Sequence, residues 1–216
     1  MHKAKYVFVL VVLSLVTTFS ATAALPPSNK ENEKPSQLYI PLALSRTSAK
    51  NYAESWATRR NPKYKSFGSD CTNFASQAIG PEGGGYAMQY ASPTWHMKKV
   101  QVWYGWKWQW TNSWSVVGDF RSMLYSRGWG EWWGYQTPGA NNSAWYGDIL
   151  GYDWTGDGIW DHASVEVAYS GCDPNSGWCG DLVDQHTTDR YHAFWTLQPY
   201  NPNWQTTRIG LWHIKY

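Results

Sequence analysis

The sequence predicts an α+β domain in which helices pack against an antiparallel β-sheet. Helix-type spacing of apolar residues recurs in the chain up to about residue 128. From residue 146 onward the pattern changes to short β-branched or aromatic runs separated by turn residues. Helices first and strands after are typical of this fold class.

The first 44 residues are predicted to lie outside the folded domain. Two lysines, an apolar run over residues 6–16 and a small-residue stretch up to Ala23 are typical of a secretory signal peptide over residues 1–23. The apolar run, about 11 residues, is shorter than the roughly 20 that a membrane-spanning helix needs. Residues 24–44, rich in prolines and polar residues, indicate a flexible leader. We therefore expect a secreted, extracellular protein with no stable membrane insertion after cleavage and a domain over residues 45–216.

The balance of charges gives no support for a nucleic-acid partner. The chain has 18 Lys and Arg against 16 Asp and Glu. Loss of Lys3 and Lys5 with the signal peptide makes the two counts equal. Without a block of like charges, nothing favours a nucleic-acid partner.

The second of the first two predicted helices carries a lone cysteine. Residues 45–61 have one apolar face and must end before Pro62; that face contains Ala49, Tyr52, Ala53 and Trp56. Asp70 is a suitable N-cap for a second helix that Gly80 would end. This second helix carries Cys71 in its first turn.

The middle of the chain is predicted to contain a loop and a third helix. Residues 81–112 are rich in Gly, Trp and Lys without a clear period, which indicates mostly loop. Residues 113–128 predict a helix that ends at Gly128, with Val116, Phe120, Met123 and Leu124 facing inward.

Four strands are expected in the remainder. The runs that predict them are 146–154, 161–169, 181–187 and 208–216. Cys172 and Cys179 flank the turn-forming stretch DPNSGW, so a disulfide at this hairpin tip is plausible in an oxidising compartment. It would leave Cys71 unpaired, either as a small buried apolar residue or as a reactive thiol.

A nucleophilic site can be assembled from these elements. The first turn of a helix favours the thiolate form of Cys71, and unpaired N–H groups there can face an oxyanion. His162 begins one strand of the predicted hairpin. Reflection through the hairpin tip places the segment Gln185–Asp189 beside it, including His186. One histidine would be the base and the other would orient it.

Seventeen Trp and 15 Tyr are the unusual feature of the composition. Such rings suit stacking on sugars or lining a groove for an extended polar ligand, and they also suit core packing. The groove candidates are Trp95, Trp145 and Trp160.

Several motifs together resemble a known family. The stretches YAESWATRRNPKYKSFGSDCTNFASQAI, SWSVVGDFRSML, GDILGYDWTGDGIWDHASVEV and DQHTTDR are similar to the putative amidase domain of secreted bacterial proteins. That family is a branch of the papain-like cysteine peptidases, related to the NlpC-type and CHAP-type cell-wall hydrolases. The resemblance covers most of residues 45–191.

The resemblance implies a papain-like fold, with Cys71 as nucleophile and His162 as general base. Related enzymes use a third polar residue after the base, a position that His186 fits. The papain pattern has a glutamine shortly before the cysteine, but here no glutamine lies between Gln37 and Cys71. The remaining oxyanion or orienting candidates are the backbone N–H of Cys71 and the side chains of Ser69, Asp70, Gln185 and Asp189.

Metal sites receive less support. The turn-rich stretch DWTGDGIWD spaces its acidic residues like a calcium loop, but Ser164 stands where an EF-hand needs an acidic residue. The alternative to a calcium loop is a tight turn that orients His162. No close Cys/His pairs favour zinc, so we expect no metal and no cofactor.

The sequence therefore predicts a secreted cysteine hydrolase that cuts an amide through a thioester, with a cell-wall peptide or glycan as substrate. Two alternatives stay open: a catalytically silent module that binds walls or carbohydrate, and an acyl transferase with the same triad.

Overall fold

The computed structural model describes residues 45–85 and 94–215. The predicted signal peptide and leader lie outside these residues. In chain order the elements are α1 (Arg46–Trp56), α2 (Cys71–Ile79), β1 (Met97–Val102), β2 (Gly105–Trp110), α3 (Asn112–Ser115), α4 (Val117–Ser126), β3 (Gly130–Tyr135), β4 (Ile149–Asp153), β5 (His162–Cys172), β6 (Cys179–Gln185), β7 (Arg190–Phe194), the 3-10 turn η1 (Gln198–Tyr200) and β8 (Arg208–Ile214).

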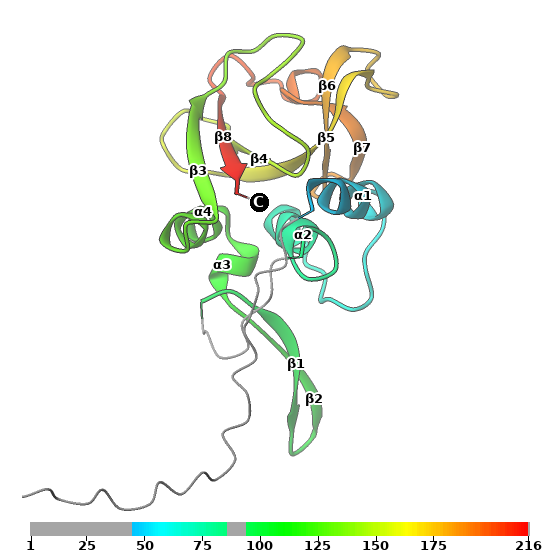
Figure 1. Ribbon diagram of the computed structural model, residues 1–216, viewed down its shortest axis with the longest axis vertical. Helices are drawn as coiled ribbons and strands as arrows, with labels where there is room; N and C mark the ends of the chain where they lie inside the picture. Colours follow the sequence, from blue (N-terminus) through cyan, green and yellow to red (C-terminus); the bar gives the residue numbers. More distant parts are fainter. Residues whose placement is uncertain (1–44, 86–93, 216) are drawn as a thin grey trace, which may run out of the picture. The chain divides into compact units, whose positions relative to one another are not determined.

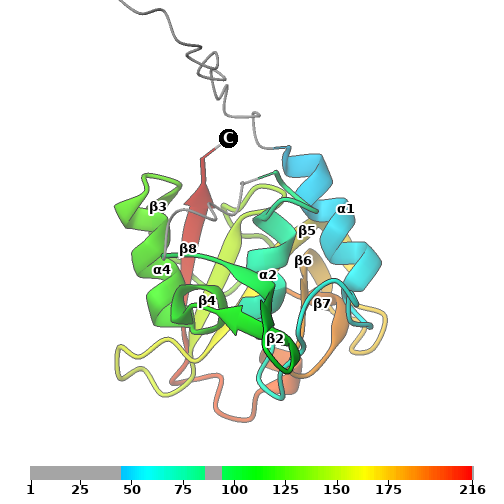
Figure 2. The ribbon, with the colours of Figure 1, turned by 90° about the horizontal axis from the view of Figure 1, so that it is seen from below.

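A six-stranded antiparallel sheet organises this part of the chain. Its strand order is β3-β8-β4-β5-β6-β7, and β1 pairs only with β2 in a separate hairpin (Figure 1). Helices α1 and α2 pack against β5, and α4 packs against β3. In Figure 2, α2 runs between α1 and α4. The arrangement brings the start of α2 to the strand that His162 begins.

Apolar side chains cover both faces of the sheet, because alternate residues of each strand point to opposite sides. In β8, Trp212 joins the core beneath the helices, whereas its neighbour Leu211 joins a second cluster on the opposite face. The buried helix residues Phe74 and Phe120 complete the first core. With both faces covered, the central strands hold the site residues rigidly.

Both predicted helices form: α2 matches its predicted range, whereas α1 ends at Trp56, five residues before the predicted limit. The Ser48 N–H donates to Ser45 Oγ at 3.1 Å, which caps α1 at its first turn. Asp70 occupies the N-cap position of α2, but its carboxylate makes no capping bond. That carboxylate is engaged by other groups of the site described below.

The prediction of a loop over residues 81–112 is wrong for its last part, which forms the β1–β2 hairpin. Three alternating tryptophans of β2 provide the strand signal: Trp106, Trp108 and Trp110. Directly opposite residues in an antiparallel pair share a face, and these three lie opposite Gln101, Lys99 and Met97. Lys107 and Gln109 separate the three tryptophans, so no continuous apolar run marks this strand.

The single helix predicted over residues 113–128 is instead two. Val116 has an extended backbone, φ −121° and ψ 126°, which ends α3 and begins α4. Its side chain is exposed, contrary to the prediction, whereas Phe120, Met123 and Leu124 are buried as predicted. A β-branched residue favours this extended conformation.

Two further strands, β3 and β7, were not predicted. β3 has glycines at residues 130 and 134, and β7 is interrupted by His192 in the left-handed region at φ +53°. Neither run shows a clean alternation. Both strands form at the edges of the sheet, where pairing with one neighbour suffices. Across residues 45–85 and 94–215, no helix has the length and apolar character required to cross a membrane.

Candidate active site

Cys71 is the first residue of α2 and the free thiol of the molecule, since Cys172 and Cys179 form the predicted disulfide. Its side chain is 7% exposed. The N–H of a first helical residue has no partner within its own helix. The thiol therefore lies at the positive end of a helix, next to an amide that is available to a ligand.

The turn before β5 positions His162. The Asp153 carboxylate accepts hydrogen bonds from the N–H groups of Gly156, Asp157 and Gly158 at 2.7, 3.1 and 2.8 Å. These bonds use the acidic side chain that a calcium loop would need for its ion. Among the described residues, no group of three His, Cys, Asp or Glu side chains is arranged to hold a metal ion.

The pKa of the Cys71 thiol depends on the neighbouring His162 imidazole. Burial raises the pKa of the Cys71 thiol, but a hydrogen bond to His162 and the charge of that ring lower it. The Ala163 N–H and the Thr72 hydroxyl lower it further, and the resulting pKa lies below that of an ordinary cysteine. A lowered pKa increases the fraction of thiolate, which is the nucleophilic form.

Gln185 orients the imidazole from the opposite side. Its Oε1 lies 2.9 Å from His162 Nε2, and its Nε2 donates to the Thr188 carbonyl at 3.0 Å. The second bond identifies which amide atom is oxygen, because only the NH2 group can donate to a carbonyl. His162 Nε2 must then carry a hydrogen, and Nδ1 is left with the lone pair that can accept the thiol proton.

The hairpin register explains why Gln185 occupies this place. Cys172 pairs with Cys179 at the tip, and Val165 pairs with Asp184 farther along. Between these pairs β5 advances seven residues and β6 only five, because of bulges in β5. The opposite strand is therefore displaced by two residues from a simple reflection about the tip.

His186 has a different environment from the one predicted. Its Nδ1 lies 2.9 Å from Asp70 Oδ2, and its Nε2 donates to the Trp56 carbonyl at 2.8 Å. Both ring nitrogens are thus occupied by groups other than His162. Successive residues at the end of β6 point to opposite sides, so Gln185 and His186 cannot both face the same ring.

Asp70 is the centre of a buried polar network rather than an oxyanion donor. Besides His186, its carboxylate receives the Arg60 Nε at 2.7 Å, the Asn73 amide at 2.7 Å and the Phe67 N–H at 2.9 Å. This network holds the residue that immediately precedes Cys71.

The last two polar candidates do not contact His162. Asp189 forms a two-point ion pair with Arg60, with N–O distances of 2.8 and 2.9 Å, and this contact lowers the Asp189 pKa. Ser69 is exposed on the approach to α2. Of the four polar candidates, only Gln185 bonds to the predicted base.

The three predicted groove tryptophans do not gather around Cys71. Trp95 is 2% exposed and donates to Ser76 Oγ within the core, which rules out a groove position. Trp160 packs on the sheet, where Gly151 leaves space for its ring. Trp145 is 51% exposed, and its ring packs edge-on against His213.

A tryptophan that the sequence analysis did not select lies at the site instead. The ring of Trp154 stacks on the His162 imidazole, with centroids 5.5 Å apart and planes at 26°. Its position in the turn-rich stretch eight residues before His162 could have identified it. The turn that Asp153 closes folds it back over the histidine.

Comparison with known proteins supports an amidase relationship. A family model described as a putative amidase domain matches residues 43–209. The uncharacterized protein YhbB of Bacillus subtilis (strain 168) is 29% identical over 170 residues. That alignment covers 78% of this chain and 50% of YhbB, so the chain spans about half the length of the curated relative it matches. No solved structure matches the chain at a significant level.

Proposed function

The chain belongs to the putative amidase domain family, and on that basis we propose that it is a cysteine-dependent amidase with Cys71 as nucleophile, His162 as general base and Gln185 as orienting residue. The observation that carries the proposal is the hydrogen bond between the His162 imidazole and the Gln185 amide, next to a thiol whose pKa that imidazole lowers. Nucleophile, base and orienting group in this order are the parts that covalent acyl chemistry needs.

In the proposed reaction, the thiol proton passes to His162 Nδ1 and the Cys71 sulfur attacks the substrate carbonyl carbon. The C–N bond breaks as the imidazolium returns the proton to the leaving amine, and a thioester remains on Cys71. Water then attacks the thioester with His162 again as base. The acid product leaves and the thiol is restored.

The oxyanion that forms at each attack needs hydrogen-bond donors. The backbone N–H of Cys71 is the donor that the helix start supplies. Ser69 is the side-chain candidate, because it is exposed close to the thiol in sequence.

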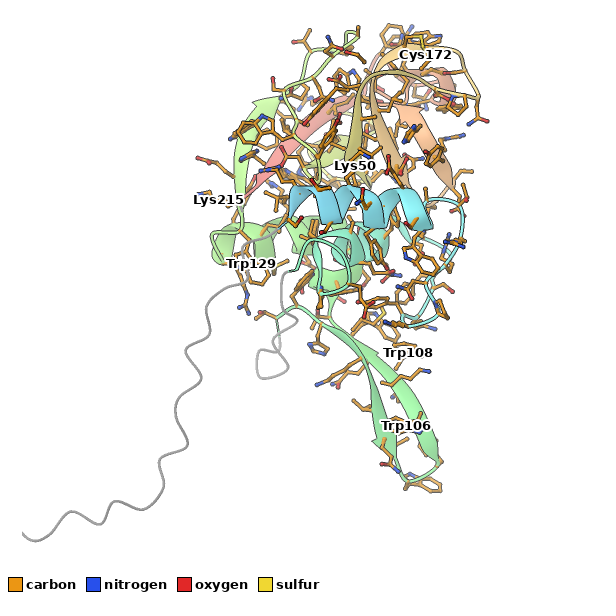
Figure 3. The ribbon with its side chains drawn as sticks, turned by 45° about the vertical axis from the view of Figure 1, so that its right-hand side comes forward. Lys50, Trp106, Trp108, Trp129, Cys172 and Lys215 are labelled. Atoms are coloured by element: carbon orange, nitrogen blue, oxygen red, sulfur yellow. A yellow bond between two sulfur atoms is a disulfide. The ribbon has the colours of Figure 1, made fainter. Side chains whose placement is uncertain are left out.

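We further propose that the protein is secreted and that its substrate is an amide of the bacterial cell wall. The Cys172–Cys179 disulfide supports secretion, and the aromatic row of β2 supports the substrate (Figure 3). Trp106 is 68% exposed, Trp108 is half-buried, and Trp110 packs edge-on against Phe67 with centroids 5.1 Å apart. Since Phe67 donates to Asp70, the row ends next to the residues that hold Cys71.

The proposal is tested by iodoacetamide labelling of the full domain across pH. We expect Cys71 to react well below pH 8.5, the ordinary pKa of a cysteine being about 8.5, and His162→Ala to shift its labelling to higher pH. His192→Ala is the matched control, since His192 pairs with Glu54 away from the thiol.

Slow labelling of Cys71 at the same rate in the wild-type protein and in His162→Ala would contradict the assignment. A purified cell-wall digest that is the same with the wild-type protein and with Cys71→Ala would favour the silent binding module. Products analysed by mass spectrometry with and without added amine would separate hydrolysis from acyl transfer.

A further inference from the structure

A cavity of about 270 Å³ opens beside the proposed base. Its lining includes the three site residues His162, Gln185 and Trp154, together with Arg190, Tyr200 and Asn203. Its volume is slightly below the roughly 300–1,000 Å³ of pockets that take drug-sized ligands. The space therefore suits a small group, of the size of one or two amino acids.

Arg190 gives this cavity a positive charge. It is the first residue of β7 and lies directly opposite Gln185 in the strand register, which places it next to the orienting residue. Its guanidinium carbon lies 3.6 Å from the centre of the Tyr200 ring. Tyr200 is itself fixed by a hydrogen bond from its hydroxyl to Asp173 Oδ2 at 2.6 Å.

No carboxylate neutralises Arg190 within residues 45–85 and 94–215. The adjacent Asp189 is committed to Arg60 by two hydrogen bonds. No residue that lines the cavity is acidic. A guanidinium that rests on an aromatic face keeps its N–H groups free for a planar anion, which arginine binds with two parallel hydrogen bonds.

The side on which the cavity lies determines which part of a substrate it can hold. His162 lines it and Cys71 does not. In the proposed reaction the acyl part stays on the sulfur, whereas the amine part receives the proton from His162 and leaves on the histidine side. A group in this cavity therefore belongs to the leaving amine.

From this placement we infer that the cavity binds the carboxylate of the leaving amine through Arg190, an inference that rests on the proposed function. The enzyme would then release an amino acid or short peptide that carries a free carboxylate close to the cut bond. A carboxylate is favoured over other anions because a peptide-type leaving amine ends in one, and the arginine fork matches its planar geometry.

Binding to the Cys71→Ala protein tests the inference, since this variant cannot consume the ligand. The probes are trialanine with a free carboxyl end and the same peptide with a carboxamide end, each made from L- and from D-alanine. By calorimetry, at least one free-acid peptide should bind about tenfold or more tighter than its amide. Arg190→Gln in the same background should remove the difference.

Arg208→Gln is the matched control, because Arg208 is an exposed arginine outside the cavity. It should preserve the preference for the acid. Equal binding of the acid and amide peptides would overturn the inference. Absence of binding by both would overturn it as well. Inorganic phosphate is tested as a competitor in the same assay. If it binds as tightly as the free-acid peptide and loses this affinity in Arg190→Gln, the carboxylate assignment is overturned.

These outcomes are separate from those of the labelling test. Normal His162-dependent labelling of Cys71 without acid-selective binding would leave the amidase proposal intact and remove the inference. Acid-selective binding without activated labelling would leave an anion site with no amidase chemistry beside it.

Discussion

Gln185 Oε1 lies 2.9 Å from His162 Nε2, and the same side chain is fixed by its bond to the Thr188 carbonyl. One amide thus determines both the orientation and the tautomer of the proposed base. A neutral glutamine suffices for this role, because it accepts the Nε2 hydrogen and stabilises the imidazolium that forms when the thiol loses its proton.

Gln185→Ala should slow iodoacetamide labelling of Cys71 at pH 6 by about tenfold. A loss of imidazolium stabilisation that raises the thiol pKa by one unit reduces the thiolate fraction about tenfold below that pKa. Gln205→Ala, at an exposed glutamine, should label like the wild type. Labelling of Gln185→Ala at the control rate would show that the amide does not support the thiolate–imidazolium pair.

His186→Ala should reduce stability rather than thiol reactivity. It leaves the buried Asp70 carboxylate without one of its hydrogen-bond partners, and a buried polar group left unsatisfied costs about 1–3 kcal/mol. Arg60 remains in contact with Asp70, so the carboxylate stays paired. Urea denaturation measures the loss, and the half-buried His192 serves as control with an expected cost of about 1 kcal/mol or less.

In the folded fraction of His186→Ala, the pH midpoint of Cys71 labelling should stay close to the wild-type value. If His186→Ala shifts this pH midpoint as much as His162→Ala does, His186 takes part in activating the thiol.

Asp184 should make the protein less stable as the pH rises from 4 to 7. Burial raises the pKa of Asp184 to about 7, and the nearby Glu54 charge adds to the effect. The folded state therefore keeps a proton that the unfolded chain, with a pKa of about 3.9, releases at lower pH. Stability from this group is complete below the unfolded pKa and is lost as the pH rises toward 7, by about 1.4 kcal/mol per pH unit.

Asp184→Asn should reduce the fall in the free energy of unfolding between pH 4 and pH 7 by that amount per unit. Part of the fall should remain, since burial also raises the Glu166 pKa well above its usual range. Asp119→Asn, at an exposed position, should keep the full wild-type slope. Identical slopes for all three proteins in urea titrations would mean that Asp184 is ionised in the folded state.

Trp106→Ala should weaken sedimentation with purified cell walls while labelling of Cys71 is retained. Its ring is exposed at the outer end of the β2 row and does not contact the thiol. Removing one stacking ring should lower affinity by about tenfold, in line with the 0.5–1.5 kcal/mol or more that aromatic contacts contribute. Trp204→Ala removes an exposed tryptophan outside this row and should sediment normally. Equal sedimentation of the two variants would argue against a role of β2 in wall binding.

The sequence alone determined the local features of this protein. Ser45 and Asp70 mark the starts of α1 and α2, so the position of Cys71 at a helix start follows from the neighbouring residues. The spacing of Cys172 and Cys179 about a turn likewise predicted the disulfide. These features depend on contacts between residues close in the chain, where periodicity and turn chemistry act directly.

Only the tertiary structure decided which distant side chains meet. Bulges in β5 displace the register by two residues, and alternation along β6 then gives His162 the Gln185 amide and turns His186 toward Asp70. The same packing buries Trp95 and brings Trp154 onto the histidine. The two-residue shift keeps Gln185 on the same face as His162 but brings it closer along the strand, and no local pattern reports the bulges that set it.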